Sequence, residues 1–145
     1  MRAVVQRVSR ARVDVAEKTV SEIGQGLVVL VCAMDNETPD ISSWANRLCR
    51  LRVFSDEAGK MNKSLLDSGG SLLLVSQFTL SADMKKGLRP SFARASSPTL
   101  AETQIAALAK SCHDLGVPTQ TGAFGADMTV HLTNDGPVTV WIDKP

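Results

Sequence analysis

Apolar and polar residues alternate along the first part of the chain. From Arg2 to Ile23 the apolar side chains recur mostly at every second position, which is the spacing of one face of a β-strand. We predict two or three antiparallel strands here, with a turn at 16–18. The run from Leu27 to Cys32 is apolar throughout and contains several β-branched residues. This composition predicts a central strand.

Two later segments carry apolar residues three and four positions apart, which is the spacing of one helical face. The first begins at Pro39 or Asp40, and the second follows Ser97-Pro98, because proline is favourable at the first helical position. Gly116 and Pro118 end the second segment. The apolar positions are Ile41, Trp44, Leu48 and Leu51 in the first predicted helix, and Ile105, Leu108, Ala109, Cys112 and Leu115 in the second.

The stretch from Ser71 to Leu80 predicts a buried strand that runs into polar side chains. Its apolar part, 72–75, follows two glycines and is typical of a strand buried on both faces. Ser76, Gln77 and Thr79 then need hydrogen-bond partners if they are buried, since an unpaired buried polar group costs about 1–3 kcal/mol. The stretch forms either the wall of a polar pocket or a strand end satisfied by neighbouring backbone.

Near the C-terminus, alternating residues at 128–132 and 138–142 predict two further strands. The segment 134–137 between them resembles a hairpin turn, but Pro137 fixes its own φ and lacks an N–H group. An X–Pro bond is also the place where a cis peptide is cheap, at about 0.5–1 kcal/mol above trans. With Gly136 before the proline, two successive carbonyls are uncovered and free to face a ligand.

Length and charge limit the class of protein. With 145 residues and 43% hydrophobic content, the chain predicts one domain, residues 1–145. A net charge of +1 excludes an extended nucleic-acid-coating surface. A local basic patch remains possible at 81–95, where four cations stand against one anion; this loop is either solvated or contacts phosphate. The four cations are Lys85, Lys86, Arg89 and Arg94.

Neither a membrane nor a metal is expected. The N-terminus lacks the apolar block of a signal peptide, and no run approaches the roughly 18–20 apolar residues of a membrane span, so we expect a cytoplasmic protein. Cys32, Cys49 and Cys112 lack CxxC spacing and a neighbouring histidine. We predict buried reduced thiols, no bound metal and no cofactor.

The remaining chemistry is electrostatic. The P-loop, GxSxG, GxGxxG and HExxH motifs are absent. Ser76 lacks an obvious base, because His113 is predicted on a helix surface and His131 on a strand with no obvious carboxylate partner. What remains is a site of hydroxyls, amides and backbone N–H groups that stabilise an oxyanion. Such a site suits a labile ester better than an amide.

Four segments together resemble the D-aminoacyl-tRNA deacylase family in its bacterial and eukaryotic form, and residues 1–8 resemble its first strand. One departure is Leu88, where the family usually has a second basic residue. The four segments are Ser76-Gln77-Phe78-Thr79-Leu80, Gly87-Leu88-Arg89-Pro90-Ser91-Phe92, Gly122-Ala123-Phe124-Gly125-Ala126-Asp127-Met128 and Asn134-Asp135-Gly136-Pro137-Val138-Thr139.

The resemblance implies an α+β domain with a mainly antiparallel sheet or half-barrel and two main helices. It implies a homodimer that hydrolyses the ester between a D-amino acid, or glycine, and the terminal ribose of tRNA. Neither DNA nor a membrane is an expected partner. The residues that the resemblance assigns to tRNA contact are Lys85, Lys86 and Arg89.

The resemblance also implies a division of labour within the site. The wall 76–78 and Phe124 line the adenosine and ester pocket, and the wall offers backbone donors to the oxyanion. Gly136 and Pro137, through a cis bond, reach into the partner's pocket and exclude L-side chains, and Arg7 braces that loop. The remaining residues assigned to the site are Met128 and Ala95, which contact substrate, and Thr79.

Three hypotheses stay open at this point. In the first, water attacks the ester with help from the substrate's own 2′-hydroxyl, and no residue acts as nucleophile. In the second, Ser76 or Thr79 is the covalent nucleophile of a general esterase. In the third, the chain is a non-catalytic module that binds RNA ends or nucleotides through the same pocket.

Overall fold

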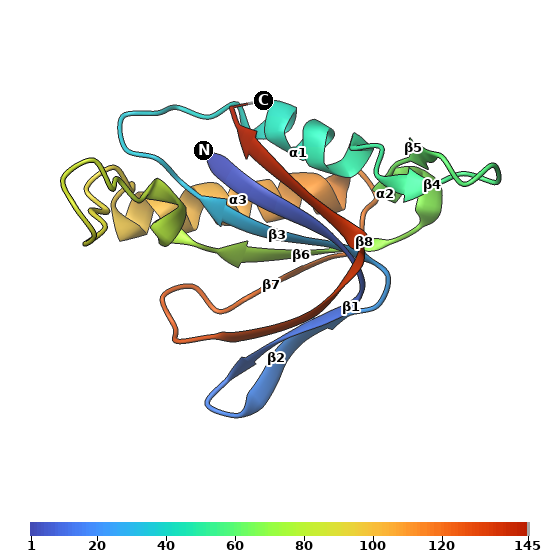
Figure 1. The fold of residues 1–145 in the computed structure, drawn as a ribbon, viewed down its shortest axis with the longest axis horizontal. Helices are drawn as coiled ribbons and strands as arrows, with labels where there is room; N and C mark the ends of the chain where they lie inside the picture. Colours follow the sequence, from blue (N-terminus) through green and yellow to red (C-terminus); the bar gives the residue numbers. More distant parts are fainter. Residues whose placement is uncertain (145) are drawn as a thin grey trace.

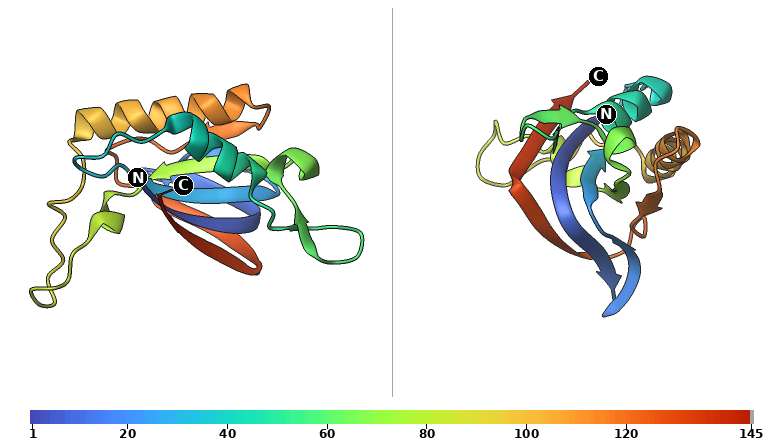
Figure 2. Two further views of the ribbon diagram at one scale, coloured as in Figure 1. Left: turned by 90° about the horizontal axis from the view of Figure 1, so that it is seen from above. Right: turned by 90° about the vertical axis from the view of Figure 1, so that its right-hand side faces the viewer.

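The structure, a computed structural model, describes residues 1–144. A curved β-sheet forms a half-barrel, and two long helices lie side by side on one of its faces (Figures 1 and 2). The predicted α+β class with two main helices is confirmed. The elements are β1 (Arg2–Val15), β2 (Lys18–Ile23), β3 (Gly26–Cys32), α1 (Ile41–Arg50), β4 (Phe54–Ser55), β5 (Met61–Lys63), α2 (Leu65–Ser68), β6 (Ser71–Ser76), the 3₁₀ helix η1 (Phe78–Ser81), α3 (Pro98–Asp114), β7 (Thr119–Thr121) and β8 (Thr129–Asp143).

The long strand β1 organises the sheet. One of its edges pairs with β8, and the other pairs with β3 and then β2, all antiparallel. The parallel strands β6 and β7 extend the sheet beyond β3. The alternation predicted up to Ile23 is confirmed as β1 and β2, with their turn at Ala16 and Glu17, which both have positive φ.

The two strands predicted near the C-terminus are one strand. β8 runs without interruption through the segment 134–137, because it follows β1 along almost its whole length. Two shifts of register near Val8 absorb the irregular residues. The hydrophobic pattern could not reveal this continuity, which depends on pairing with the other end of the chain.

The helices bury their apolar faces against the sheet. The side chain of Asp40 accepts a hydrogen bond from the Ser43 N–H group at 3.0 Å and so caps α1, as predicted for a helix that opens there. Trp44 and Leu48 of α1 and Leu108 of α3 are almost completely buried in the main core. None of the helices within residues 1–144 is both long and apolar enough to cross a membrane.

The prediction of one strand from Ser71 to Leu80 is wrong in its second half. β6 ends at Ser76, and residues 78–81 turn into η1. The neighbouring strand β7 pairs only as far as Leu74, so the backbone beyond it must be satisfied otherwise. The turn does this itself, because the Leu80 N–H group donates to the Gln77 carbonyl at 3.2 Å.

Candidate active site

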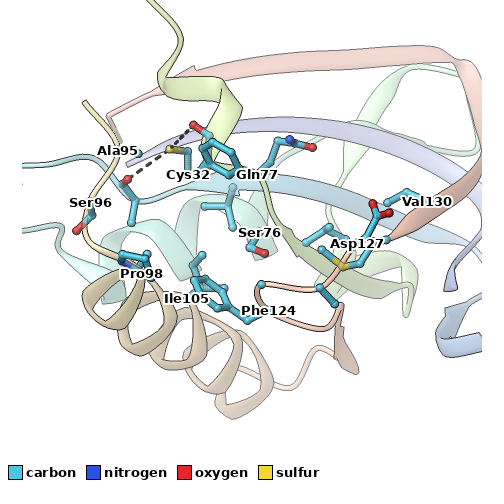
Figure 3. A pocket seen from close by; sticks show the side chains of 18 residues that line it. Cys32, Ser76, Gln77, Ala95, Ser96, Pro98, Ile105, Phe124, Asp127 and Val130 are labelled. Atoms are coloured by element: carbon cyan, nitrogen blue, oxygen red, sulfur yellow. Dashed lines mark hydrogen bonds between the residues drawn. The ribbon is translucent and has the colours of Figure 1, made fainter. Parts of the chain in front are cut away.

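A cavity of about 570 Å³ opens at the carboxyl ends of β3 and β6. One wall is formed by Ser76, Gln77 and Phe78, where β6 passes into η1, and the start of α3 forms another. The loop 124–128 closes the opposite side (Figure 3). The lining is mostly apolar, and among residues 1–144 Asp127 is the only charged residue in it.

The structure brings six of the predicted site residues around this cavity and leaves the others outside it. Thr79, Arg7, the Gly136-Pro137 pair and the cations of the loop 81–95 do not line it. The six residues that do are Ser76, Gln77, Phe78, Ala95, Phe124 and Met128.

Two backbone N–H groups at the start of η1 have no hydrogen-bond acceptor in the part of the chain that the structure describes. They belong to Phe78 and Thr79. The first N–H groups of any helical turn lack a partner within the turn. By contrast, the Gln77 N–H group donates to the Val31 carbonyl at 2.8 Å. Phe78 lines the cavity and Thr79 directly follows it, so two adjacent N–H donors beside this wall have no acceptor within the described residues.

The hydroxyl groups have less to offer as nucleophiles. Thr79 Oγ1 accepts a hydrogen bond from Gln77 Nε2 at 2.6 Å, so it holds the glutamine side chain. Neither histidine lines the cavity. The expectation that His131 lacks a carboxylate partner is wrong, because its Nε2 atom lies 2.9 Å from Asp14 Oδ2. This pair of His131 and Asp14 joins β8 to β1, and His131 does not line the cavity that contains Ser76.

Arg7 contacts the segment before the Gly-Pro pair. Its Nε atom donates to the Asp135 carbonyl at 3.1 Å and lies 3.2 Å from the Asp135 carboxylate. Its Nη1 atom donates to the Val53 carbonyl. The peptide bond between Gly136 and Pro137 is cis, and both residues are exposed on β8.

The basic loop projects from the cavity wall as a long excursion (Figure 2). A bridge between Asp83 and Ser91 closes it, and the ring of Phe92 packs edge-on against Phe78 with centroids 5.2 Å apart. Leu88 is 95% exposed. In residues 1–144, no carboxylate lies within ion-pair distance of the cations at 85, 86 and 89.

Sequence reasoning missed Cys32 as a lining residue. Its Sγ atom lies 3.3 Å from the Ala33 carbonyl and 3.5 Å from the Phe78 carbonyl, and its one proton is donated to one of them at a time (Figure 3). Burial raises the pKa of this thiol, so the neutral S–H form is favoured. The only sequence signal was its place at the end of a central strand. Ser96, Ile105 and Asp127 also line the cavity and were not singled out.

The described residues contain no cluster of three side chains suited to hold a metal ion. The arrangement offers an apolar enclosure with two adjacent, unpartnered N–H donors beside one wall. Such donors stabilise the negative charge that develops on a carbonyl oxygen during acyl transfer. The chemistry that the site supports best is therefore attack on a carbonyl carbon that is already reactive.

Comparison with known proteins identifies the family. Residues 4–143 match the family described as D-Tyr-tRNA(Tyr) deacylase. Proteins named D-aminoacyl-tRNA deacylase from Paracoccus denitrificans (strain Pd 1222) and Thermomicrobium roseum (strain ATCC 27502 / DSM 5159 / P-2) are each 52% identical over 99% of this chain and cover 97% and 94% of their own length. The chain belongs to the D-aminoacyl-tRNA deacylase family.

Solved structures agree with this fold. A protein described as c-Myc DNA Unwinding Element Binding Protein superposes with a TM-score of 0.94 at 39% identity, covering 100% of this chain and 99% of its own. A probable eukaryotic D-amino acid tRNA deacylase superposes with a TM-score of 0.83 at 15% identity, with 97% of both chains covered. The second likeness concerns the fold alone.

Proposed function

We propose that this protein hydrolyses the ester between a D-amino acid and the terminal ribose of tRNA in the cytoplasm, releasing both. The observation that carries the proposal is the pair of unpaired N–H groups, of Phe78 and Thr79, at the wall of a cavity of about 570 Å³. The names of relatives that are 52% and 51% identical support the substrate class.

The mechanism we propose uses water as the nucleophile. The two N–H groups receive the developing oxyanion, and the substrate's 2′-hydroxyl assists the water, since no histidine base lines the cavity. One oxyanion donor typically contributes about 2.7–4 kcal/mol. Two such donors suffice only for a labile acyl group, and an aminoacyl ester meets that condition.

We propose that chiral selection needs a second copy of the chain. Gly136 and Pro137 are exposed on β8 and do not line the cavity of their own chain. β8 is an edge strand of 15 residues, and a long exposed edge readily pairs with another strand. In the homodimer, the carbonyls of the pair enter the partner's cavity and exclude L-side chains. Glycine, which lacks a side chain, is accepted.

We also propose that the loop 81–95 contacts the tRNA backbone. The free cations at 85, 86 and 89 provide local positive charge beside the cavity, although the whole chain carries only +1. Phosphate contacts of this kind position a substrate without reading its sequence. The proposed contact is therefore confined to one loop, and DNA is not a proposed partner.

A single assay tests the proposed activity. Purified protein is incubated with matched D- and L-aminoacyl-tRNA, and release of the amino acid is followed. We expect the D-form to be hydrolysed far faster. Equal rates, or no turnover, contradict the deacylase. Tight binding of tRNA or adenosine without turnover would instead support a non-catalytic RNA-end module.

The covalent alternative is separated by two variants. If Ser76 or Thr79 is a nucleophile, an acyl-enzyme can be trapped, and the corresponding alanine variant loses all activity. Under the water mechanism, Ser76→Ala and Thr79→Ala both keep measurable turnover, because the N–H donors remain. Rapid quenching followed by mass spectrometry of the intact protein detects the acyl adduct.

A further inference from the structure

We propose that Arg2 and Cys32 are positioning residues that together hold the turn η1 in its catalytic orientation. The inference rests on the proposed deacylase function and deepens it, because it names what fixes the two oxyanion donors. Neither residue is assigned to the site by its sequence pattern. Both lie outside η1, in strands that meet it only in the folded chain.

The two residues are direct cross-strand partners. In the antiparallel pair of β1 and β3, Arg2 lies opposite Cys32, so their side chains project from the same face of the sheet. Cys32 Sγ lies within hydrogen-bond distance of the carbonyl of Phe78, at 3.5 Å, a contact that the Ala33 carbonyl at 3.3 Å shares. Arg2 Nη1 donates to the carbonyl of Leu80 at 3.1 Å. The cross-strand pair Arg2 and Cys32 therefore contacts two carbonyls of the same turn.

These carbonyls matter because of the planar peptide group. The carbonyl of Phe78 and the N–H group of Thr79 belong to one peptide unit, and in a trans peptide they point in opposite directions. Fixing the carbonyl toward Cys32 therefore aims the Thr79 N–H group away from it. The thiol controls the direction of one of the two donors.

η1 cannot hold this orientation by itself. It spans only residues 78–81, and the N-cap residue before it, Gln77, makes no side-chain capping bond. Short 3₁₀ turns have poor hydrogen-bond geometry and little intrinsic stability. Phe78 is 59% exposed, so burial of this side chain adds little. The contacts from the sheet below the turn supply the missing restraint.

Arg2 is itself held in place. Its side chain is only 15% exposed, its Nε atom lies 3.4 Å from Asp143 Oδ2, and its guanidinium lies 5.9 Å from the centroid of the Trp141 ring. These contacts come from β8. The end of β8 therefore fixes the arginine, and the arginine fixes the end of η1.

The test measures steady-state kinetics with D-aminoacyl-tRNA for Arg2→Met and Cys32→Ala. We expect kcat to fall by about 10-fold or more in each variant, with KM changed by no more than about 2-fold, because the ground-state contacts remain and the oriented donors are lost. Arg2→Lys and Cys32→Ser each keep a donor and are expected to recover part of the lost kcat.

Arg12→Met is the matched control. Arg12 also lies on β1, but it is exposed and pairs with Asp14 instead of η1. This variant is expected to keep the kcat of the unmodified protein. Thermal melts of all variants separate positioning from folding, because a merely structural role would lower the melting temperature and leave kcat unchanged in the folded protein.

A readout without catalysis completes the test. ¹⁵N relaxation of the Phe78 and Thr79 amides is expected to show increased mobility in Arg2→Met and Cys32→Ala, and not in Arg12→Met. Unchanged mobility together with unchanged kcat overturns the proposal. If the unmodified protein shows no turnover, the deacylase proposal fails, and the relaxation data still decide whether the two residues restrain η1.

Discussion

Gln77 and Thr79 hold each other's side chains beside the cavity. The 2.6 Å hydrogen bond from Gln77 Nε2 occupies the Thr79 hydroxyl as an acceptor. No histidine lines the cavity to remove its proton. The side chains of this wall set its shape, and the backbone N–H groups of Phe78 and Thr79 are two hydrogen-bond donors that have no partner within residues 1–144.

Replacing Phe78 tests this assignment directly. Phe78→Pro removes the backbone N–H group, and proline is compatible with the first position of a helical turn. We expect kcat for D-aminoacyl-tRNA to fall by about 10²–10³-fold relative to Phe78→Ala, which loses only the ring. Single-turnover kinetics of the two variants give the comparison, and equal rates would show that this N–H group does not contact the oxyanion.

Gly136 is the second residue whose backbone is under constraint. Its φ is +124°, and an added Cβ would lie 2.8 Å from Arg7 Nη2 and 2.9 Å from Val138 Cγ2. We expect Gly136→Ala to destabilise the fold by about 1–3 kcal/mol and to displace Arg7. Urea denaturation measures the first effect, and the ratio of D- to L-aminoacyl-tRNA hydrolysis measures the second.

Gly59→Ala is the control for that variant. Gly59 also has positive φ, but an added Cβ there meets no atom within 4 Å. Gly59→Ala therefore introduces the strain of an alanine at positive φ without any contact to Arg7. If both variants lose stability equally and keep the same chiral ratio, the contact between Arg7 and Gly136 has no part in selectivity.

At the scale of elements, β1, β2 and β8 are joined by one carboxylate. Asp14 Oδ1 accepts from the Thr19 hydroxyl at 2.7 Å, and Asp14 Oδ2 contacts Arg12 at 3.1 Å and His131 at 2.9 Å. The hydrogen bond from Thr19, followed by Arg12 and His131, lowers the pKa of Asp14 below its usual range. The carboxylate links the β1–β2 hairpin to β8, which lies far away in the sequence.

The lowered pKa sets the direction of a pH effect. A carboxyl whose pKa is lower in the folded state stabilises the fold above its unfolded-state pKa, and this stabilisation is lost as the pH falls through the folded-state pKa. We expect Thr19→Val to raise the pKa of Asp14 toward its usual value and to weaken the acid dependence of stability. NMR titration of the Asp14 carboxyl carbon measures the shift.

Thr103→Val provides the comparison. Thr103 donates its hydroxyl to the Thr99 carbonyl on the exposed side of α3, and none of its contacts reaches Asp14. The pKa of Asp14 should be the same in this variant as in the unmodified protein. An unchanged Asp14 pKa in Thr19→Val would exclude the hydroxyl as the main cause.

In the proposed homodimer, each site combines the cavity of one chain with the Gly136-Pro137 pair of the other. Two differently defective chains should therefore complement each other. Phe78→Pro damages the cavity wall, and Gly136→Ala damages the segment that enters the partner. In a mixed dimer, one site combines both defects and the other combines neither. After subunit exchange about a quarter of all sites combine an intact wall with an intact Gly136-Pro137 segment, since half of the dimers are mixed and each has one such site. We therefore expect hydrolysis of L-aminoacyl-tRNA to fall to about half of its rate before exchange, while hydrolysis of D-aminoacyl-tRNA stays unchanged.

The same experiment reports the oligomeric state. Sedimentation is expected to give twice the 15.5 kDa mass of the chain, and specific activity is expected to fall on dilution below the dimer dissociation constant. A monomeric mass with full chiral selectivity would show that the site is complete in one chain. If the rates do not change on exchange although the samples are dimeric, the Gly136-Pro137 pair and the cavity wall of one site belong to the same chain.

The local structure could be predicted from residue spacing. Side-chain spacing follows directly from backbone geometry, so the alternation in β1 and β2, the helical stripes of α1 and α3 and the cap at Asp40 were predictable. The sequence resemblance also identified the wall 76–78, because that motif is contiguous in the chain. These features depend on residues within a few positions of one another.

The way in which distant segments meet depends on the folded chain. η1 begins where β7 has stopped and only β3 still pairs with the end of β6. The meeting of Arg2 with Cys32 depends on the register between β1 and β3, which no local pattern contains. The cavity and its supports arise from such long-range pairings, whereas the hydrophobic periodicity records only which face of each element is buried.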